Sequence, residues 1–361
     1  MPQDMKAAEQ EYILHLKNGE KVYYKPNWER ATIIPEEDIA YKEKVDMLDS
    51  VIVLNRKCQL DCFFCRDGRG TVEVKDDITT DAEIEAILSN QKDTVSFEWG
   101  EPTLSREKLL KWVKFAKKNG IKDIILVTNA IVLHNKEYCQ ALIDAGVGLF
   151  NVNVQAYTDE QFVEIYQSNS QLLKLRNKWI QNLIDLWYGE HVRFNFVVNK
   201  RNYNYLLNYA LWVYKTFPQI FYIEMNFVKV LGKVIDAKNE TMPSYPDIEE
   251  NLKKMLKFCD KVGLKVIVEW VPLCYLKWYE HLNIDVFKHI KKDSTFFAEK
   301  EKSEKCKWCK LNNLCTGARL NYFSYYGEDD LKPVDYITKD EVIENYHKHI
   351  DEEFLFERYR K

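Results

Sequence analysis

DSVIVLN, residues 49–55, leads almost directly into CQLDCFFC, residues 58–65. The first stretch is a short apolar run with β-branched residues, which is typical of a buried strand. The second stretch places Cys58, Cys62 and Cys65 within eight positions, immediately after that strand. In barrels of parallel strands the active site lies at the carboxyl ends of the strands, so this cysteine loop is the first candidate site.

Strand-like and helix-like segments alternate from this point to about residue 270. The further strand-like segments are TVSFEW (94–99), DIILVTN (123–129), GLFNVNVQ (148–155), HVRFNFVVN (191–199), IFYIEMNFVKV (220–230) and KVIVEW (265–270). Repeated strand–helix units with nearly continuous apolar strands predict a parallel sheet covered by helices. We therefore predict an α/β fold, a partial (βα)6 barrel that resembles a TIM barrel.

The sequence on either side of this core divides into smaller parts. YILHLKNGEKVYY, residues 12–24, alternates loosely around Asn18-Gly19, which predicts a hairpin. Beyond residue 271 the alternation of strand-like and helix-like segments stops. TKDE begins a charged helix with a capping box from Thr338 to Glu341. The predicted domains are a hairpin and connector (1–48), the barrel (49–270), a small cysteine-containing module (271–335) and a C-terminal helix (336–361).

Composition and charge exclude several classes of protein. Acidic residues outnumber lysine plus arginine by 56 to 52, so the sum offers no electrostatic footprint for nucleic acid or an anionic membrane. The N-terminus lacks the apolar core of a signal peptide, and no apolar stretch approaches the length that crosses a bilayer. We expect a cytoplasmic protein, in which reducing conditions disfavour disulfides among the nine cysteines.

Three thiolates in one short loop are suited to hold three irons of a 4Fe–4S cluster, because soft sulfur ligands favour iron–sulfur clusters. The spacing C-x3-C-x2-C after a first strand resembles the radical S-adenosylmethionine (radical SAM) superfamily. That resemblance implies that the fourth iron is chelated by the amino and carboxylate groups of SAM. It also places Phe64, the aromatic residue before the last cysteine, in the SAM site. The alternative is a zinc site completed by a distant fourth cysteine.

FEWGEP, residues 97–102, resembles the Gly-Gly-Glu-Pro motif of the same family. Trp99 stands in place of the first glycine, while Gly100, Glu101 and Pro102 match the motif. The resemblance implies that backbone groups and the Glu101 carboxylate engage the ammonium group of SAM. Taken alone, Gly-Glu-Pro is an ordinary turn.

Polar residues at later strand ends extend the resemblance. Thr128 in VTNA matches the ending of the family's third strand, and Asn153 and Gln155 fall where the fourth strand often carries a ribose-binding serine. Gln167 stands where related enzymes place an arginine for the SAM carboxylate, and a neutral amide holds that group less strongly. Leu231 in KVLGKV resembles the residue beside adenine. The alternatives are strand-end groups satisfied by loops and, for Leu231, a place in the core.

A second group of cysteines lies in the C-terminal module. Its members are Cys274, Cys306, Cys309 and Cys315. Four thiolates complete either a fully ligated 4Fe–4S cluster or a tetrahedral zinc site, and spacing does not separate the two. C-x2-C-x5-C resembles the SPASM extension of radical SAM enzymes in a shortened, twitch-like form with one auxiliary cluster. Cys274 is the fourth ligand by elimination, because Cys139 and Cys259 lie in amphipathic helices and suit the core.

The resemblance implies reductive cleavage of SAM to methionine and a 5′-deoxyadenosyl radical that abstracts hydrogen from the substrate. It also implies a flavodoxin- or ferredoxin-type reductant as partner, and an auxiliary cluster favours an oxidative outcome. We place oxidative modification or cross-linking of a ribosomally made peptide or protein first. Dehydrogenation of a small molecule, such as a sugar, aminocyclitol or nucleotide, is the alternative, and a non-enzymatic zinc-binding module is the remote one. The sequence nominates no catalytic side chain.

Overall fold

The computed structural model describes the backbone of residues 12–15, 21–25 and 32–35, and residues 50–65, 78–90, 93–292 and 299–350. The chain divides into two compact units, which are described separately. The sheet unit comprises Asp49–Val271 and His349–Lys361, and the cysteine-rich unit comprises Met1–Leu48 and Pro272–Lys348.

The sheet unit is built on seven parallel strands in the order β10-β9-β8-β7-β6-β5-β4. The strands are β4 (Ser50–Ile52), β5 (Thr94–Phe97), β6 (Asp123–Thr128), β7 (Leu149–Asn153), β8 (Val192–Val198), β9 (Tyr222–Phe227) and β10 (Val266–Glu269). Neighbours in sequence are neighbours in the sheet, as successive βα units require. The predicted α/β fold is confirmed, with a seventh strand after six βα units.

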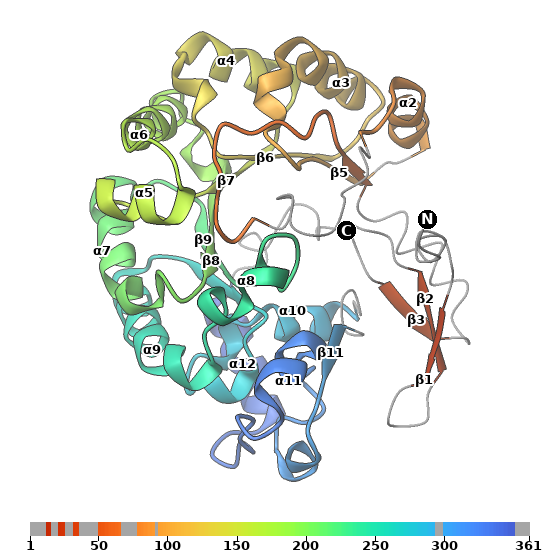
Figure 1. Cartoon of the computed structure of the whole chain (residues 1–361), viewed down its shortest axis with the longest axis vertical. Coiled ribbons are helices and arrows are strands. Elements are labelled where there is room, and N and C mark those ends of the chain that lie inside the picture. Colours follow the sequence, from red (N-terminus) through yellow and green to blue (C-terminus); the bar gives the residue numbers. More distant parts are fainter. Residues whose placement is uncertain are drawn as a thin grey trace. The chain divides into compact units, whose positions relative to one another are not determined.

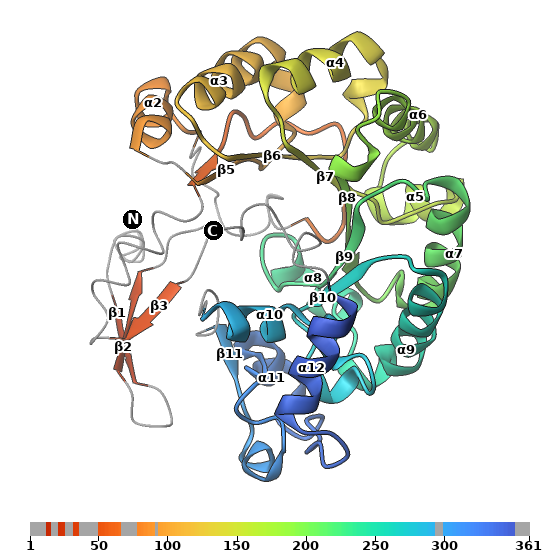
Figure 2. The same ribbon diagram turned by 180° about the vertical axis from the view of Figure 1, so that it is seen from behind.

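Helices follow each of the first six strands. They are α2 (Asp81–Asn90), α3 (Arg106–Lys118), α4 (Lys136–Ala145), α5 (Asp159–Tyr166), α6 (Gln171–Asp185), α7 (Leu206–Thr216), α8 (Val234–Thr241) and α9 (Tyr245–Val262). Figures 1 and 2 show α3, α4, α6, α7 and α9 in an arc along one face of the sheet. Local signals set the helix ends. For example, a capping box between Ser244 and Asp247 begins α9, and Gly263, in a left-handed conformation, ends it.

The two faces of the sheet differ in chemistry. The helix-covered face is apolar and at most 2% exposed, through Val95, Phe97, Ile124, Leu126, Phe150, Val152, Phe194, Phe196, Ile223 and Met225. Because side chains alternate along a strand, the residues between these point to the opposite face. On that face β7, β8 and β9 carry Asn151, Asn153, Arg193, Asn195, Glu224 and Asn226. Strands β7, β8 and β9 therefore carry polar residues on one face, which differs from the nearly continuous apolar strands predicted.

The cysteine-rich unit contains a three-stranded antiparallel sheet, β1 (Tyr12–His15), β2 (Lys21–Lys25) and β3 (Thr32–Pro35). The predicted hairpin is confirmed, with a third strand that the sequence did not indicate. Its Asn18-Gly19 turn lies outside the described residues. The unit also contains α10 (Ile284–Lys291), α11 (Leu320–Tyr326), α12 (Lys339–His349) and a short ladder of β11 (Lys300–Glu301) with β12 (Ala318–Arg319).

The C-terminal helix α12 begins as its sequence predicts. The Thr338 amide donates to the Glu341 carboxylate at 2.7 Å, and the Glu341 amide donates to the Thr338 hydroxyl at 3.4 Å. The capping box is therefore confirmed. The part of the predicted helix after residue 350 lies outside the described residues. Among the helices that the structure describes, none has the length and apolar character needed to cross a bilayer.

Candidate active site

The cysteine loop that follows β4 is fixed by segments distant in sequence. The Asp61 and Phe63 amides donate to the carbonyls of Tyr166 and Ile165, at the end of α5, at 3.1 and 3.2 Å. The Lys233 amide, after β9, donates to the Cys65 carbonyl at 3.1 Å. Because β4, α5 and the segment after β9 all supply contacts, the loop lies at the carboxyl edge of the sheet, where the sequence predicts the active site.

The three thiols of this loop influence one another. Desolvation raises the pKa of Cys58 to about 11, and the charges of Glu101 and Cys65 add to the effect. Desolvation also raises the pKa of Cys62, and Cys65 and Cys58 add to it. The Cys58 sulfur accepts hydrogen bonds from the Leu60 amide and from Asn129 Nδ2, both at 3.4 Å. Hydrogen bonds from N–H groups to sulfur are a feature of thiolates that ligate iron–sulfur clusters.

Gly100 lies against the segment that leads into the cysteine loop. Its φ is +56°, and a Cβ at this position would lie 2.6 Å from the Asn55 carbonyl oxygen and 3.0 Å from the Arg56 backbone. The next residue, Glu101, donates its amide to the Lys57 carbonyl at 2.7 Å. Only glycine satisfies both the left-handed conformation and the close approach. The Gly-Glu-Pro turn therefore positions the strand end from which the cysteines follow.

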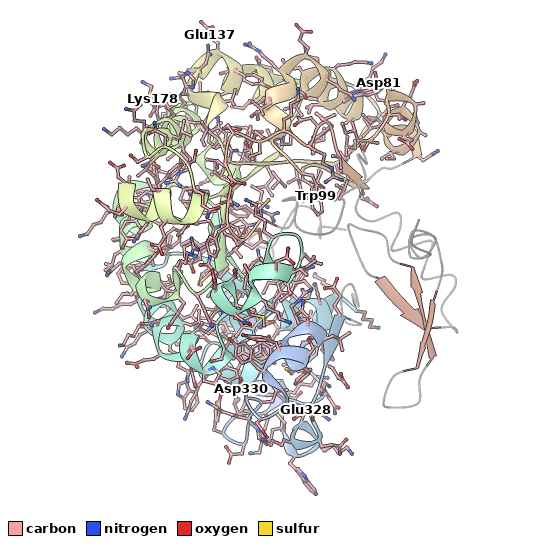
Figure 3. The ribbon with its side chains drawn as sticks, in the orientation of Figure 1. Asp81, Trp99, Glu137, Lys178, Glu328 and Asp330 are labelled. Carbon is pink, nitrogen blue, oxygen red and sulfur yellow. The ribbon has the colours of Figure 1, made fainter. Side chains whose placement is uncertain are left out.

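Trp99 also adopts a left-handed conformation, with φ of 68°, where the family motif has a glycine. For a side chain other than glycine this conformation costs about 1–2 kcal/mol. The Arg56 guanidinium lies 5.2 Å from the centroid of the Trp99 ring. Figure 3 shows Trp99 on the side of β5 away from α3 and α4. Trp99 thus adopts a conformation that glycine takes at the least cost.

The Glu101 carboxylate is completely buried and is held by hydrogen bonds within the protein. One oxygen accepts from the Thr103 amide at 3.2 Å, the Thr103 hydroxyl at 2.5 Å and the Thr128 hydroxyl at 2.7 Å. The other accepts from the Asn129 amide at 2.7 Å. Burial raises the pKa of Glu101, and these hydrogen bonds oppose the rise. Glu101 therefore ties the ends of β5 and β6 together, and its predicted contact with SAM stays a prediction.

Replacing Glu101 by glutamine tests this structural role. In the Glu101→Gln variant, an NH2 group replaces one of the two carboxylate oxygens. That group would face an N–H or O–H donor, to which it cannot form a hydrogen bond. We therefore expect a loss of about 1–3 kcal/mol in the free energy of unfolding. Urea denaturation of the anaerobic protein measures it. Glu250→Gln, on the exposed face of α9, is the control and should leave stability almost unchanged. Equal effects of the two substitutions would contradict the role assigned to Glu101.

Two other predicted SAM-site residues are used by the protein itself. Gln155 is completely buried, and its side chain donates to the Asn195 carbonyl at 2.9 Å and accepts from the Val197 amide at 2.7 Å. It therefore joins the end of β7 to β8, which matches the alternative of a satisfied strand-end group. Asn153 Oδ1 accepts a hydrogen bond from the Tyr166 hydroxyl at 3.1 Å.

The remaining predicted residues differ in exposure. Phe64 is buried, and Pro102 is buried at the start of a short 3-10 helix, Pro102–Ser105. Gln167 is exposed in a left-handed conformation at the end of α5. Leu231 is 38% exposed, so the core alternative does not hold for it. Thr128 is buried through its hydrogen bond to Glu101. The structure brings Phe64, Gly100, Glu101 and Thr128 to the carboxyl edge, and contact of any of them with SAM stays a prediction.

Sequence reasoning missed several polar residues of this site. Asn129, which donates to the Cys58 sulfur, follows Thr128 in the same VTNA motif and was detectable there. The polar residues of the uncovered sheet face were also missed. Their signal is alternation within strands, visible in NVN (151–153), RFN (193–195) and EMN (224–226). Such alternation indicates a strand with one polar face.

In the cysteine-rich unit the four cysteines of the second group line one cavity, together with Pro272, Leu311 and Leu331. Desolvation raises the pKa of Cys274 to about 12, and the charges of Cys315, Cys306 and Cys309 add to the effect. The structure thus brings Cys274 to the other three from more than 30 positions earlier in the sequence. Cys139 and Cys259 are completely buried in α4 and α9, as their core assignment predicts.

Backbone amides point at the sulfurs of this second group. The Val334 amide donates to the Cys309 sulfur at 3.2 Å, and the Gly317 amide donates to the Cys315 sulfur at 3.3 Å. Desolvation raises the pKa of Cys315 to about 11. A bound metal reverses such shifts, because it stabilises the thiolate.

Both thiol sets match an iron–sulfur cluster in donor chemistry: soft sulfur ligands, clustered, with N–H donors to sulfur. Within the described residues no three side chains of histidine, cysteine, aspartate or glutamate converge as a ready metal site. None of the nine cysteines, all in described residues, forms a disulfide, as the sequence predicts. The fit therefore depends on donor type and grouping.

In a comparison with known protein families, residues 52–186 match the model of the Radical SAM superfamily. That family implies one 4Fe–4S cluster and SAM as cofactors. A probable GTP 3′,8-cyclase of Saccharolobus islandicus is 31% identical over 158 residues, which are 43% of this chain and 49% of the relative. A probable GTP 3′,8-cyclase of Methanococcus aeolicus is 29% identical over 153 residues, 41% of this chain and 49% of the relative.

The chain spans about half the length of the curated relatives that it matches. Among solved structures, native anSMEcpe with bound AdoMet and Cp18Cys peptide is 16% identical. The similarity covers 83% of this chain and 96% of that chain, with a TM-score of 0.49.

Proposed function

We propose that this chain, whose residues 52–186 match the model of the Radical SAM superfamily, is an enzyme that cleaves SAM reductively and takes a hydrogen atom from a small polar substrate. The observation that carries the proposal is the cysteine loop at the carboxyl edge of the parallel sheet, held beside the Gly-Glu-Pro turn. A zinc-binding module would not need the contacts that join this loop to β5 and β6.

When bound, a reduced 4Fe–4S cluster would supply the electron for cleavage of the SAM carbon–sulfur bond, which is the chemistry that hydrogen abstraction from the substrate requires. Cys58, Cys62 and Cys65 would hold this cluster. Asn129 and the Leu60 amide would hold the Cys58 sulfur in orientation. Electrons would come from a flavodoxin- or ferredoxin-type partner.

A small molecule of the nucleotide class is the substrate that we favour over a peptide. The similar curated proteins are named as GTP 3′,8-cyclases, which supports a nucleotide substrate. The polar sheet face also supports a small polar substrate, since amide side chains offer donors and acceptors of hydrogen bonds. Neither of the two relatives described above is named for peptide maturation.

The second cysteine group is proposed to hold an auxiliary 4Fe–4S cluster in a SPASM- or twitch-like module. Support comes from the four thiols that line one cavity and from the amides that donate to the Cys309 and Cys315 sulfurs. Four cysteine ligands leave no open iron. Such a cluster suits electron transfer from a substrate radical better than direct binding of substrate.

The double variant Cys306→Ala, Cys309→Ala tests the auxiliary cluster. Two clusters predict about eight irons per chain in the wild type, and we expect this variant to keep about half of them. Anaerobic iron and sulfide analysis measures the content. Full retention of iron would contradict the auxiliary assignment, whereas zinc in place of iron in both proteins would indicate structural zinc sites.

The proposed activity is tested on anaerobically purified, reduced protein supplied with SAM. We expect 5′-deoxyadenosine and methionine to form, as detected by chromatography with mass spectrometry. Colourless protein that contains zinc and leaves SAM intact would refute the radical SAM function and favour the zinc-binding module.

A further inference from the structure

Three neighbouring strands of the sheet unit each carry an asparagine near the carboxyl end, on the face opposite the buried apolar side chains. These residues are Asn153 on β7, Asn195 on β8 and Asn226 on β9, and together they are called the asparagine row. Asn153 and Asn195 are register partners, and Asn226 Nδ2 donates to Asn195 Oδ1 at 3.4 Å. All three are half-buried. The row is therefore continuous across three strands and partly open.

A buried polar layer lies one step below the row, towards the amino ends of the strands. Arg193 Nε lies 3.6 Å from Glu224 Oε2, and both side chains are less than 10% exposed. Asn151, the register partner of Arg193, is 5% exposed, and its Oδ1 has no hydrogen-bond partner within the described residues. Because Arg193 already faces a carboxylate, this layer offers little net charge to a group bound above it.

A short sequence pattern is repeated at the ends of two strands that lie on either side of the row in the strand order. FEW (97–99) ends β5, and VEW (268–270) ends β10. Trp99 and Trp270 both adopt left-handed conformations, with φ of 68° and 69°. Each ring faces a cation, Arg56 at 5.2 Å and Lys229 at 4.5 Å. Strained backbone that persists at two matching strand ends indicates a functional constraint.

The hydrogen-bonding capacity of the row is only partly used inside the protein. Asn153 Oδ1 accepts from Tyr166, and Asn195 Oδ1 accepts from Asn226. Within the described residues, the amide nitrogens of Asn153 and Asn195 and the amide oxygen of Asn226 form no hydrogen bond. The row thus presents donors and an acceptor side by side, all uncharged.

From this arrangement we infer that Asn195 and Asn226 of the asparagine row bind the uncharged nucleoside part of the substrate, through its base edge or its sugar hydroxyls, while the predicted ribose contact of Asn153 is with SAM. The inference rests on the proposed function. Asparagine pairs well with the donors and acceptors of base edges and hydroxyl groups. A phosphate group would find no cation in the row, and the guanidinium below it faces Glu224. Phosphates of a nucleotide substrate therefore lie outside the row.

The test compares ligand binding by the cluster-loaded, SAM-bound protein with that of two variants. Asn195→Leu and Asn226→Leu keep approximate shape and remove the hydrogen bonds. We expect calorimetry to show binding of guanosine and GTP, little binding of inorganic triphosphate, and about tenfold weaker binding of both nucleosidic ligands in each variant. Asn208→Leu, at an exposed position on α7, is the matched control and should bind as wild type.

Two further ligands, adenosine and 2′-deoxyguanosine, show whether the row contacts the base edge or the sugar hydroxyls. A base-edge contact predicts that adenosine binds more weakly than guanosine, and a sugar contact predicts that 2′-deoxyguanosine does. Iron content and SAM binding of each variant show that it is folded.

Several results would overturn the inference. One is a loss of GTP binding in the variants with guanosine binding unchanged, since that indicates a phosphate contact. The others are unchanged binding of both ligands in the variants, and failure of the wild type to bind guanosine. If the wild-type protein cleaves SAM but fails these tests, only the assignment of the asparagine row is wrong. If the wild-type protein does not cleave SAM, the proposed function itself is wrong.

Discussion

Replacing Cys58, Cys62 and Cys65 together by alanine should abolish SAM cleavage and remove about half of the iron. Alanine offers no ligand, so the proposed SAM-binding cluster would have nothing to hold it, while the cysteine-rich unit keeps its own four thiols. The expected loss of 5′-deoxyadenosine formation is complete, because without a low-potential donor the sulfonium bond is not reduced. Anaerobic iron analysis and product detection by mass spectrometry measure the two effects.

The control for this variant is Cys139→Ala, which removes a thiol that is completely buried in α4. We expect a small loss of stability from the cavity, with iron content and SAM cleavage retained. If the triple variant still cleaved SAM, the cysteine loop would not be the cluster site. If the control lost as much iron as the triple variant, the iron content would report folding instead of ligation.

The second large effect is expected for Gly100→Ala. The new methyl group would lie 2.6 Å from the Asn55 carbonyl oxygen, and φ of +56° adds conformational strain. Backbone atoms yield less readily than a flexible side chain. We therefore expect a loss of about 2–4 kcal/mol in the free energy of unfolding and a lower iron content, since the displaced segment leads to Cys58.

Gly120→Ala separates the two causes. Gly120 also has a left-handed conformation, with φ of +79°, but a Cβ there would meet no atom within 4 Å. Its substitution should cost about 1 kcal/mol and leave iron content unchanged. Denaturation curves of both variants give the difference. If both glycines cost the same, the contact between the Gly-Glu-Pro turn and the cysteine loop would be unimportant.

The sequence predicted the features that depend on local pattern. Apolar strand runs separated by amphipathic helices gave the parallel sheet, and Thr338 with Glu341 gave the start of α12. Elimination chose Cys274 as the fourth member of the second cysteine group, and the cavity now brings it to the others. In the first two cases the decisive information lay in residue spacing, and in the third it lay in the helical context of Cys139 and Cys259.

Features that depend on long-range packing were not predictable. Gln155 is polar and at a strand end, which suggested ligand binding, but its side chain completes the pairing of β7 with β8. Glu101 is held by Thr128 and Asn129, which are close to it only after β5 and β6 pair. The polar face of β7 to β9, by contrast, was predictable from the alternation in NVN (151–153), RFN (193–195) and EMN (224–226), and it was missed.

The hydrogen bond from the Lys233 amide to the Cys65 carbonyl joins positions 168 residues apart. During synthesis the three thiols therefore emerge from the ribosome long before the chain that fixes their loop. An iron–sulfur carrier that bound the nascent chain would meet three cysteines whose loop is not yet fixed by this contact. We therefore expect the cluster to be loaded after β9 has joined the sheet. A chain truncated after Cys65 and before Lys233 should take up iron poorly even though all three ligands are present.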